Sequence, residues 1–573
     1  MSPNTRASEE SVSRFKGIDA ALLALLLALA MLLIADSGFV SGQELWPMPD
    51  AVEYAAMAVN LDRGLGPVLH FGGITYPSRY TIGYPLILAA AYPILGRKPE
   101  RLCLVTALTA LIAIAGLYLL TLWIFDRPSA IVAGLLLTTS PHFLGLSTCV
   151  LSDVPSLAVI ILAVLAFLYA EEKQSPAASA LCGILVGLAV TIRVTNSAFL
   201  IGMLAVALLV QPRRAQFARV TAFAIGFVAF PGLQVGLNLH YLGSPLSNGY
   251  AFWQPDVYSS FFTAFDPRYL FVPWDPSHRH GNFVAYAIAM LGLDGIFGQL
   301  NLGAESRTLF RARYGFYPFP VVLFAGLGVF LAMRRKRDAL TMRTVILGLS
   351  FLAALLLVYL PYFYVDPRFL LPALFIVFAA AGYGLISANR KLERGWAGFV
   401  AIALDVVVAG AIVVQTVSRL AMPLPRDSRF VADVLALRPR LNNAVLVSDI
   451  SLQWLELYAG GEGTEFVGLR SHFGAQPVNE EHLHWLYEKR SKGWSGPTPP
   501  ILLLPDGGLD PAEARRLADE DKQGRPVYLL VLNATSSEWL EVLKREVAEI
   551  DRGFALERIA HYPEMGLYRL RPR

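Results

Sequence analysis

Two aspartates, Asp50 and Asp153, are the residues of this sequence best suited to acid–base chemistry. Each borders long apolar stretches, where an ionisable side chain is costly and is therefore a functional candidate. Two carboxylates in one cavity can divide a reaction: one removes the proton of an acceptor hydroxyl, and the other orients the acceptor or holds a divalent cation such as Mg²⁺ or Mn²⁺. The structural alternative is helix capping, because Glu53 takes the capping-box position after Asp50 and Pro155 lies in the first turn after Asp153.

Fixed positive charge accompanies these carboxylates near the ends of the apolar stretches. The residues that carry it are Arg79, Arg97, Lys98, Arg101, Arg193 and Arg368. An arginine holds phosphate oxygens with its planar fork and never deprotonates, so this cluster predicts a site for a phosphate group. For each residue taken singly, a side chain that extends along the membrane to reach lipid head groups is the favoured interpretation, which the clustering weakens.

A long polar stretch at 241–317 is rich in aromatic side chains, as in YAFWQPDVYSSFF and FVPWDPSHRHGNF. His278 and His280 alternate within it and could ligate a metal, although two alternate histidines are weaker candidates than the aspartates. The aromatic residues are more typical of an interfacial belt, or of a wall for a sugar or an isoprenoid tail.

The composition shows what must hold these residues in place. Of the 573 residues, 55% are hydrophobic and only 16% are charged, whereas about a quarter of a soluble protein is charged. The chain is therefore expected to be a multi-pass membrane protein. Its net charge of +4 is too small for a nucleic-acid-binding surface. Its three cysteines, Cys103, Cys149 and Cys182, lie within apolar runs and favour neither a disulfide framework nor a zinc site.

Apolar runs of about 17 to 25 residues can cross a bilayer. Eleven such runs are predicted, near 18–35, 102–125, 130–147, 154–170, 177–193, 196–211, 220–240, 318–333, 343–360, 369–388 and 396–416. The first is interpreted as a retained span, since no small-residue cleavage site follows it. A twelfth run, 82–96, is short and contains two prolines.

Orientation follows from the basic clusters, which favour the cytoplasmic side. With the N-terminus inside and 82–96 lying in the interface, the clusters at 213–219, 334–337 and 389–394 are all cytoplasmic. If 82–96 crossed, all three would face outward. The first arrangement is therefore predicted. It places the loops 36–101 and 241–317 on the outer face of the membrane, together with Asp50 and Asp153, which were not used to derive it.

The composition changes near residue 425, where a soluble domain is predicted to follow a transmembrane domain at 1–420. Strand-like runs such as NAVLVSD, PPILLLPD, PVYLLVLN and GLYRLRP alternate with polar helical runs such as DPAEARRLADEDK. This pattern is typical of a small sheet with helices on its faces, so 425–573 is expected to be an α/β domain, outside the membrane. It lacks a glycine-rich phosphate loop.

Three segments in this order resemble the GT-C-type membrane glycosyltransferases, in particular the branch of protein mannosyltransferases and aminoarabinose transferases. The first is D-x-x-x-Y-x-x-x-A from Asp50 through Tyr54, followed by GYPLILA. The second is LSDVPSLAV around Asp153, and the third is YVDPRFLLPALFIVFAAAGYGL around Arg368. The matches span most of 36–388. One departure is Ala51, because many members carry a second acidic residue directly after the first; Glu53 is the nearest substitute here.

The resemblance implies a GT-C-like fold and a sugar donor linked to polyprenyl phosphate. It implies transfer on the outer face of the cytoplasmic membrane, with inversion at the anomeric carbon, to a lipid, glycan or protein acceptor. Asp50 would be the catalytic base and Asp153 a supporting carboxylate. Arg368 and Arg79 would contact the donor phosphate, and Tyr54 and Arg193 would complete the binding site.

Two other functions remain open at the level of the sequence. A lipid or solute transporter with an outer accessory domain would call for charged residues within the spans and matching interrupted repeats, and neither is evident. A receptor or scaffold that presents the 425–573 domain would tolerate substitution of both aspartates. A membrane glycosyltransferase explains the outward carboxylates, the arginines and the amphipathic loop together.

Overall fold

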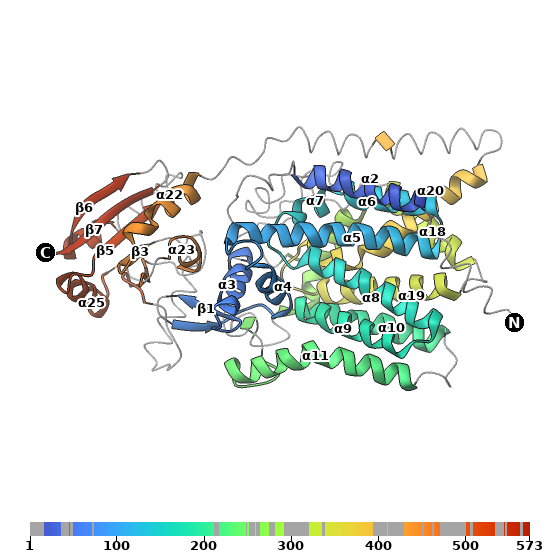
Figure 1. Cartoon of the computed structure of the whole chain (residues 1–573), viewed down its shortest axis with the longest axis horizontal. Coiled ribbons are helices and arrows are strands. Elements are labelled where there is room, and N and C mark those ends of the chain that lie inside the picture. The colour runs from blue at the N-terminus through green and yellow to red at the C-terminus, as the bar shows by residue number, and fades with distance from the viewer. Residues whose placement is uncertain are drawn as a thin grey trace. The chain divides into compact units, whose positions relative to one another are not determined.

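The computed structural model places the chain in two compact units (Figure 1). The membrane unit comprises Met1–Ser41, Arg79–Ile87 and Cys103–Pro425, and the α/β unit comprises Gly42–Ser78, Leu88–Leu102 and Arg426–Arg573. The structure describes residues 17–35, 45, 50–71, 74–210, 217–247, 249–250, 258, 264–273, 281–291, 320–334, 339–392, 409–410, 429–448, 452–460, 463–469, 500–504, 508–532, 544, 547–561 and 565–573. Part of the predicted outer loop 36–101 thus belongs to the same unit as the C-terminal residues.

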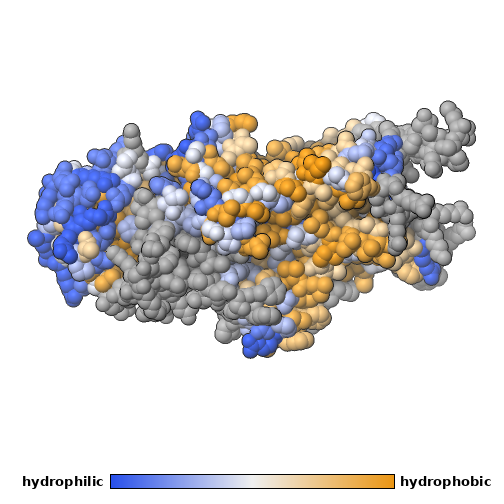
Figure 2. Space-filling model, turned by 90° about the horizontal axis from the view of Figure 1, so that it is seen from below, coloured by the Kyte–Doolittle hydropathy of each residue, from blue (hydrophilic) through white to orange (hydrophobic). Residues whose placement is uncertain are grey.

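Six helices of the described chain are long and apolar enough to cross a membrane. They are α2 (Gly17–Ile34), α5 (Cys103–Ile124), α8 (Asp153–Lys173), α11 (Phe217–Leu242), α19 (Ala339–Tyr359) and α20 (Leu374–Leu392). Three shorter apolar helices accompany them: α9 (Pro176–Ile192), α10 (Ala198–Val210) and α18 (Pro320–Arg334). Apolar residues gather over the surface of this unit in Figure 2. The chain is a multi-pass membrane protein, as its composition predicts.

The predicted single span at 130–147 is wrong. It divides into α6 (Arg127–Thr139) and α7 (Pro141–Ser147), with Ser140 in an extended conformation between them. Proline has no N–H to donate and is favoured in the first turn of a helix, so Pro141 begins a new helix. The run at 82–96 contains only the nine-residue helix α4 (Gly83–Ala91), too short to cross. Of the predicted span 396–416 only residues 409 and 410 are described, and the total of eleven spans is not confirmed.

Glycine allows some membrane helices to touch backbone to backbone. A Cβ added to Gly328 of α18 would lie 1.9 Å from the carbonyl oxygen of Ala380 in α20. A Cβ at Gly183 of α9 would lie 2.1 Å from the carbonyl oxygen of Phe223 in α11. Small residues at such contacts are typical of helix packing in lipid, where close van der Waals contact takes over from the hydrophobic effect.

Ion pairs between helices gather at one end of the membrane unit. Arg127, which begins α6, lies 2.5 Å from Asp19 in the first turn of α2. Glu171 near the end of α8 pairs with Arg219 at 2.6 Å and with Arg343 at 3.3 Å. These arginines lie near the starts of α11 and α19, so this is the end where α2, α6, α11 and α19 begin and α8 finishes.

The α/β unit contains a five-stranded mixed sheet in the order β4-β3-β5-β7-β6. Strands β3 (Val445–Ser448), β4 (Glu465–Gly468) and β5 (Val527–Leu532) are parallel, while β6 (Phe554–His561) and β7 (Met565–Pro572) continue the sheet in antiparallel fashion. Helices α22 (Arg429–Leu437), α23 (Leu452–Tyr458) and α25 (Pro511–Lys522) accompany it. Strands β3, β5 and β7 fall within predicted strand runs, whereas β4 and β6 were not predicted.

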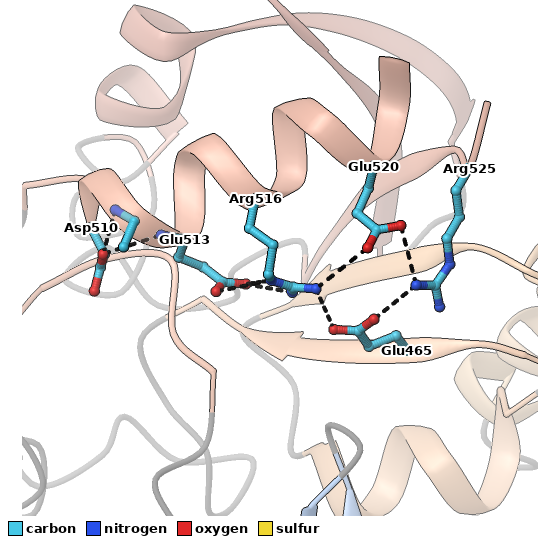
Figure 3. Close-up of polar contacts among 7 residues, drawn as sticks. Glu465, Asp510, Glu513, Arg516, Glu520 and Arg525 are labelled. Carbon is cyan, nitrogen blue, oxygen red and sulfur yellow. Dashed lines mark hydrogen bonds and ion pairs between the residues drawn. The ribbon is translucent and has the colours of Figure 1, made fainter. Parts of the chain in front are cut away.

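A network of ion pairs fastens α25 to the sheet (Figure 3). The Arg516 guanidinium of α25 lies 2.6 Å from Glu465, the first residue of β4, and 2.6 Å from Glu513. Arg525, just before β5, lies 2.9 Å from Glu465 and 3.3 Å from Glu520. Because each arginine bridges two elements, the network fixes where α25 lies over the apolar core built around Leu517.

The first part of the α/β unit is a helix and a hairpin from before the second span. Helix α3 (Asp50–Asp62) packs against β1 (Val68–Phe71), which pairs with β2 (Ile74–Pro77). The Asn60 side chain donates to the Val68 carbonyl oxygen at 2.8 Å and joins helix and hairpin. The ten residues from Ala51 to Asn60 are all buried, so α3 is a fixed element and not a loose connector.

Glu456 on α23 should make this unit pH-sensitive. Its Oε2 atom is buried without a hydrogen-bond partner among the described residues, and burial raises the pKa of the carboxyl to about 8, opposed by Arg63. As pH rises from about 4.5 to about 8 the unfolded chain ionises while the folded chain stays neutral, so stability falls. The free energy of unfolding of Glu456→Gln should therefore exceed that of wild type by about 1–3 kcal/mol at pH 7.5. Near pH 4.5 the two proteins should be equally stable.

Thermal unfolding followed across that pH range measures the effect. Glu557→Gln, which removes a half-exposed carboxylate paired with Arg571, is the matched control and should follow wild type. Equal melting temperatures of Glu456→Gln and wild type at both ends of the range would contradict the prediction.

Candidate functional site

A buried ion pair joins two of the predicted site residues. Asp153 begins α8 and is 1% exposed, and its carboxylate pairs with the guanidinium of Arg193, the residue that ends α9. The N-cap position of α8 belongs to Ser152 and not to Asp153. The Asp153 carboxylate instead pairs with an arginine. Removing one partner of such a pair leaves an uncompensated buried charge.

A tyrosine at the end of another span holds Arg193. The Arg193 guanidinium donates to the hydroxyl of Tyr359, the last residue of α19, at 3.5 Å. That hydroxyl also lies 2.7 Å from the Thr195 hydroxyl. Asn196 is buried and donates to Ser156 of α8 at 2.7 Å, which ties the turn after Arg193 to the helix that carries Asp153. The orientation of the guanidinium is thus fixed from three elements.

A second carboxylate–arginine pair lies beside the first. Asp366 caps the 3-10 helix η5 (Pro367–Ala373), accepts a hydrogen bond from the Arg368 backbone at 3.0 Å, and lies 2.9 Å from the Arg368 guanidinium. Burial raises the pKa of Asp366, while Arg368 and Arg193 lower it and the Asp153 carboxylate raises it. These mutual influences place both pairs in one electrostatic environment.

Phe369 bridges the two arginines. Its ring centroid lies 5.1 Å from the Arg193 guanidinium carbon and 5.5 Å from that of Arg368. Its ring also stacks on Tyr359, with centroids 4.6 Å apart. An aromatic face attracts a guanidinium without neutralising it, so Phe369 helps to position both arginines.

The backbone that carries this cluster is fixed by α15 (Asn282–Leu291). The Asn282 side chain is 1% exposed and donates to the carbonyl oxygens of Leu360, at 2.9 Å, and Tyr362. The Tyr286 hydroxyl donates to the carbonyl oxygen of Asp366 at 3.3 Å. The turn between α19 and η5 therefore has its carbonyl groups satisfied and presents Asp366 and Arg368 in a defined geometry.

A row of four tyrosines links Arg79 to this cluster. The Arg79 guanidinium lies 5.4 Å from the Tyr80 ring centroid. Tyr80 contacts Tyr250 at 5.8 Å between centroids, Tyr250 contacts Tyr258 at 5.0 Å, and the Tyr258 and Tyr362 hydroxyls share a hydrogen bond. The tyrosine row is thus an amphipathic wall that ends at the turn fixed by Asn282.

The structure brings together Asp153, Arg193 and Arg368, and through the tyrosine row Arg79. Asp50 and Tyr54 lie on α3 in the α/β unit, so their assignment to the same site stays a prediction. Sequence reasoning did not find Tyr359, Asp366, Phe369 or Asn282. Asp366 and Phe369 flank Pro367 and Arg368 in the quoted motif, which was the available signal; Tyr359 and Asn282 carried none.

The predicted metal does not fit the residues around Asp153. Within the described ranges no group of three or more His, Cys, Asp or Glu residues could hold a metal ion. The Asp153 and Asp366 carboxylates each already face an arginine, and a cation would compete with that guanidinium. His278 and His280 lie outside the described residues.

Comparisons with known proteins identify the fold. Residues 79–235 match the family described as dolichyl-phosphate-mannose-protein mannosyltransferase. No match is found among curated protein sequences. Among solved structures the fold matches ArnT from Cupriavidus metallidurans bound to undecaprenyl phosphate, with a TM-score of 0.56 and 13% identity over 95% of this chain and 97% of ArnT. The chain therefore has a GT-C-like membrane fold.

A second GT-C structure supports the same conclusion. The oligosaccharyltransferase of Archaeoglobus fulgidus tethered with an acceptor peptide matches with a TM-score of 0.54 and 12% identity, over 96% of this chain and 74% of the other. The same enzyme has been crystallised with Zn and sulfate. The resemblance predicted from the three sequence segments is confirmed at the level of the fold.

Proposed function

We propose that this GT-C protein is a glycosyltransferase that takes its sugar from a polyprenyl-phosphate-linked donor. The observation that carries the proposal is the pair of arginines, Arg193 and Arg368, set on Phe369 beside the buried Asp153 and the partly buried Asp366 at one end of the membrane helices. A lipid-linked phosphate needs fixed cationic donors at the membrane boundary, and planar guanidinium groups supply them. The ArnT structure with undecaprenyl phosphate supports this donor class.

The proposed reaction is a single inverting displacement. An acceptor hydroxyl or amine attacks the anomeric carbon, a bond forms between them, and the bond from that carbon to the donor phosphate oxygen breaks. Asp50 accepts the proton of the acceptor as general base. Arg193, Arg368 and Arg79 balance the charge that develops on the leaving polyprenyl phosphate, and Asp153 holds Arg193 in place for that task. Tyr54 lines the donor site.

The proposed location is the outer face of the cytoplasmic membrane, with the acceptor a lipid, a glycan or a protein. Support comes from the helix directions. The cluster lies where α8 and η5 begin and where α9 and α19 end, opposite the end that carries Arg127, Arg219 and Arg343. Basic residues favour the cytoplasmic side, so the cluster would face outward together with the 425–573 residues.

A donor panel tests the proposal. Purified wild-type protein is incubated with polyprenyl phosphates that carry a radiolabelled hexose, pentose or amino sugar, together with an envelope extract as acceptor. Release of free polyprenyl phosphate that depends on extract is the expected result, with and without chelator. The proposal is overturned if no donor class is consumed. If the protein in lipid vesicles instead moved intact donor across the membrane, a transporter would be favoured.

Arg368→Gln should raise the KM for the donor by about 10- to 100-fold with a smaller loss of kcat, because it removes a charged hydrogen-bond donor to the phosphate. Arg571→Gln, which alters a half-exposed arginine of β7, should leave both constants unchanged. Initial rates over a range of donor concentrations distinguish the two. An unchanged donor KM in folded Arg368→Gln protein would remove Arg368 from the phosphate site.

A further inference from the structure

Helix α23 of the C-terminal sequence and helix α3 of the first loop belong to one compact unit. Helix α23 packs against both α3 and β1. It lies just after strand β3, which is buried along its whole length. The helix that begins at Asp50 is therefore supported by a part of the chain some 400 residues away, on a sheet with its own apolar core.

Tyr458, at the end of α23, contacts the segment of chain that precedes α3. Its hydroxyl accepts a hydrogen bond from the backbone N–H of Leu45 at 2.9 Å, across 413 residues. Tyr458 is 1% exposed, and its ring lies 4.5 Å from that of Trp454, which is 0% exposed. Leu45 is itself 2% exposed. A buried N–H left without its acceptor is costly, so this hydrogen bond fixes the chain five residues before Asp50.

The other end of α3 is fixed as well. Asp62, its last residue, lies 2.9 Å from the Arg97 guanidinium, and Asn60 is hydrogen-bonded to Val68. The helix is thus held at both ends, and the hydrogen bond that fixes the chain before its start comes from the C-terminal sequence. Movement at that anchor would shift Asp50 more than the rest of α3.

We infer that Tyr458 is a positioning residue for the Asp50 carboxylate and that placing this carboxylate is a task of the C-terminal sequence. The inference rests on the proposed function. A general base must lie within hydrogen-bond reach of the proton it removes, and a displacement of about 1 Å can lower a rate by about 10²-fold. Tyr458 touches neither donor nor acceptor in this account; it acts through Leu45 and α3.

Tyr458→Phe tests the inference because it removes the hydroxyl and keeps the ring. We expect kcat to fall about tenfold with the donor KM unchanged, and amide hydrogen exchange to become faster in residues 45–62. Tyr528→Phe is the matched control, since Tyr528 lies in β5 and its hydroxyl makes no hydrogen bond to any described residue. It should leave rate and exchange unchanged.

A second background separates positioning from general stability. If Tyr458 acts through Asp50, Tyr458→Phe should cause no further loss of the residual turnover of Asp50→Asn protein. A tenfold loss in both backgrounds, or unaltered exchange in 45–62, would overturn the inference. Absence of turnover in wild type, or full turnover of Asp50→Asn, would instead overturn the proposed function, while the exchange measurement would still decide whether Tyr458 holds the start of α3.

Discussion

Asp50→Asn should lower kcat by about 10²- to 10⁴-fold and leave the donor KM near its wild-type value, because a general base contributes about that factor to a proton transfer. Asparagine keeps the shape of the side chain and cannot accept the acceptor proton. The side chain sits at the first position of a helix that is buried over its next ten residues, so the substitution should leave the fold intact. Single-turnover release of labelled polyprenyl phosphate measures the effect.

Asp62→Asn is the matched control, since Asp62 ends the same helix and pairs with the exposed Arg97. An exposed ion pair contributes about 0–1 kcal/mol, so this variant should turn over at close to the wild-type rate. Comparable losses in both variants would mean that α3 tolerates no charge change and would withdraw the assignment of Asp50 as the base.

Breaking the buried pair in the membrane unit should have the second large effect. Asp153→Asn and Arg193→Gln should each destabilise the protein by about 3–5 kcal/mol, because each leaves one buried charge uncompensated. Each should also lower turnover by about 10²-fold, since Arg193 loses either its charge or its fixed position. The double variant should be more stable than the sum of the single losses predicts, because it leaves no unpaired charge.

Thermal unfolding in detergent, with turnover measured in parallel, checks these expectations. Asp266→Asn is the control: Asp266 pairs with Arg268, whose side chain is 83% exposed, so its loss should change stability by less than about 1 kcal/mol. Strict additivity of Asp153→Asn and Arg193→Gln would show that the two residues do not act as a pair, and the account of the cluster would fail.

The sequence was informative where local patterns decide structure. Long apolar runs predicted the membrane helices, and short apolar runs between polar helical segments predicted β3, β5 and β7. Pattern also failed locally: Pro141 divides what looked like one span, and strands β4 and β6 were not predicted. Arg193 and Arg368 were found because a guanidinium near a membrane boundary is conspicuous in any sequence this apolar.

The remainder of the site depends on contacts that no local pattern records. Tyr359 and Asn282 are 77 residues apart and were unremarkable in their own segments, yet both contribute to the turn beside Arg193 and Arg368. Nor does the sequence indicate that α3 shares a unit with α23. Such pairings follow from tertiary packing, which composition and periodicity do not encode.

The α/β unit is built from three separate segments of the chain, so it can fold only after the third segment has been synthesised. Gly42–Ser78 and Leu88–Leu102 are synthesised early, yet their partner Arg426–Arg573 follows only after most of the membrane unit. Contacts between such distant segments form slowly, and early segments wait unpaired. The hydrogen bond between Leu45 and Tyr458 closes a loop of 413 residues. A nascent chain therefore completes α3's anchor only once Tyr458 has been made, and a ribosome that stops before that residue leaves α3 without this anchor.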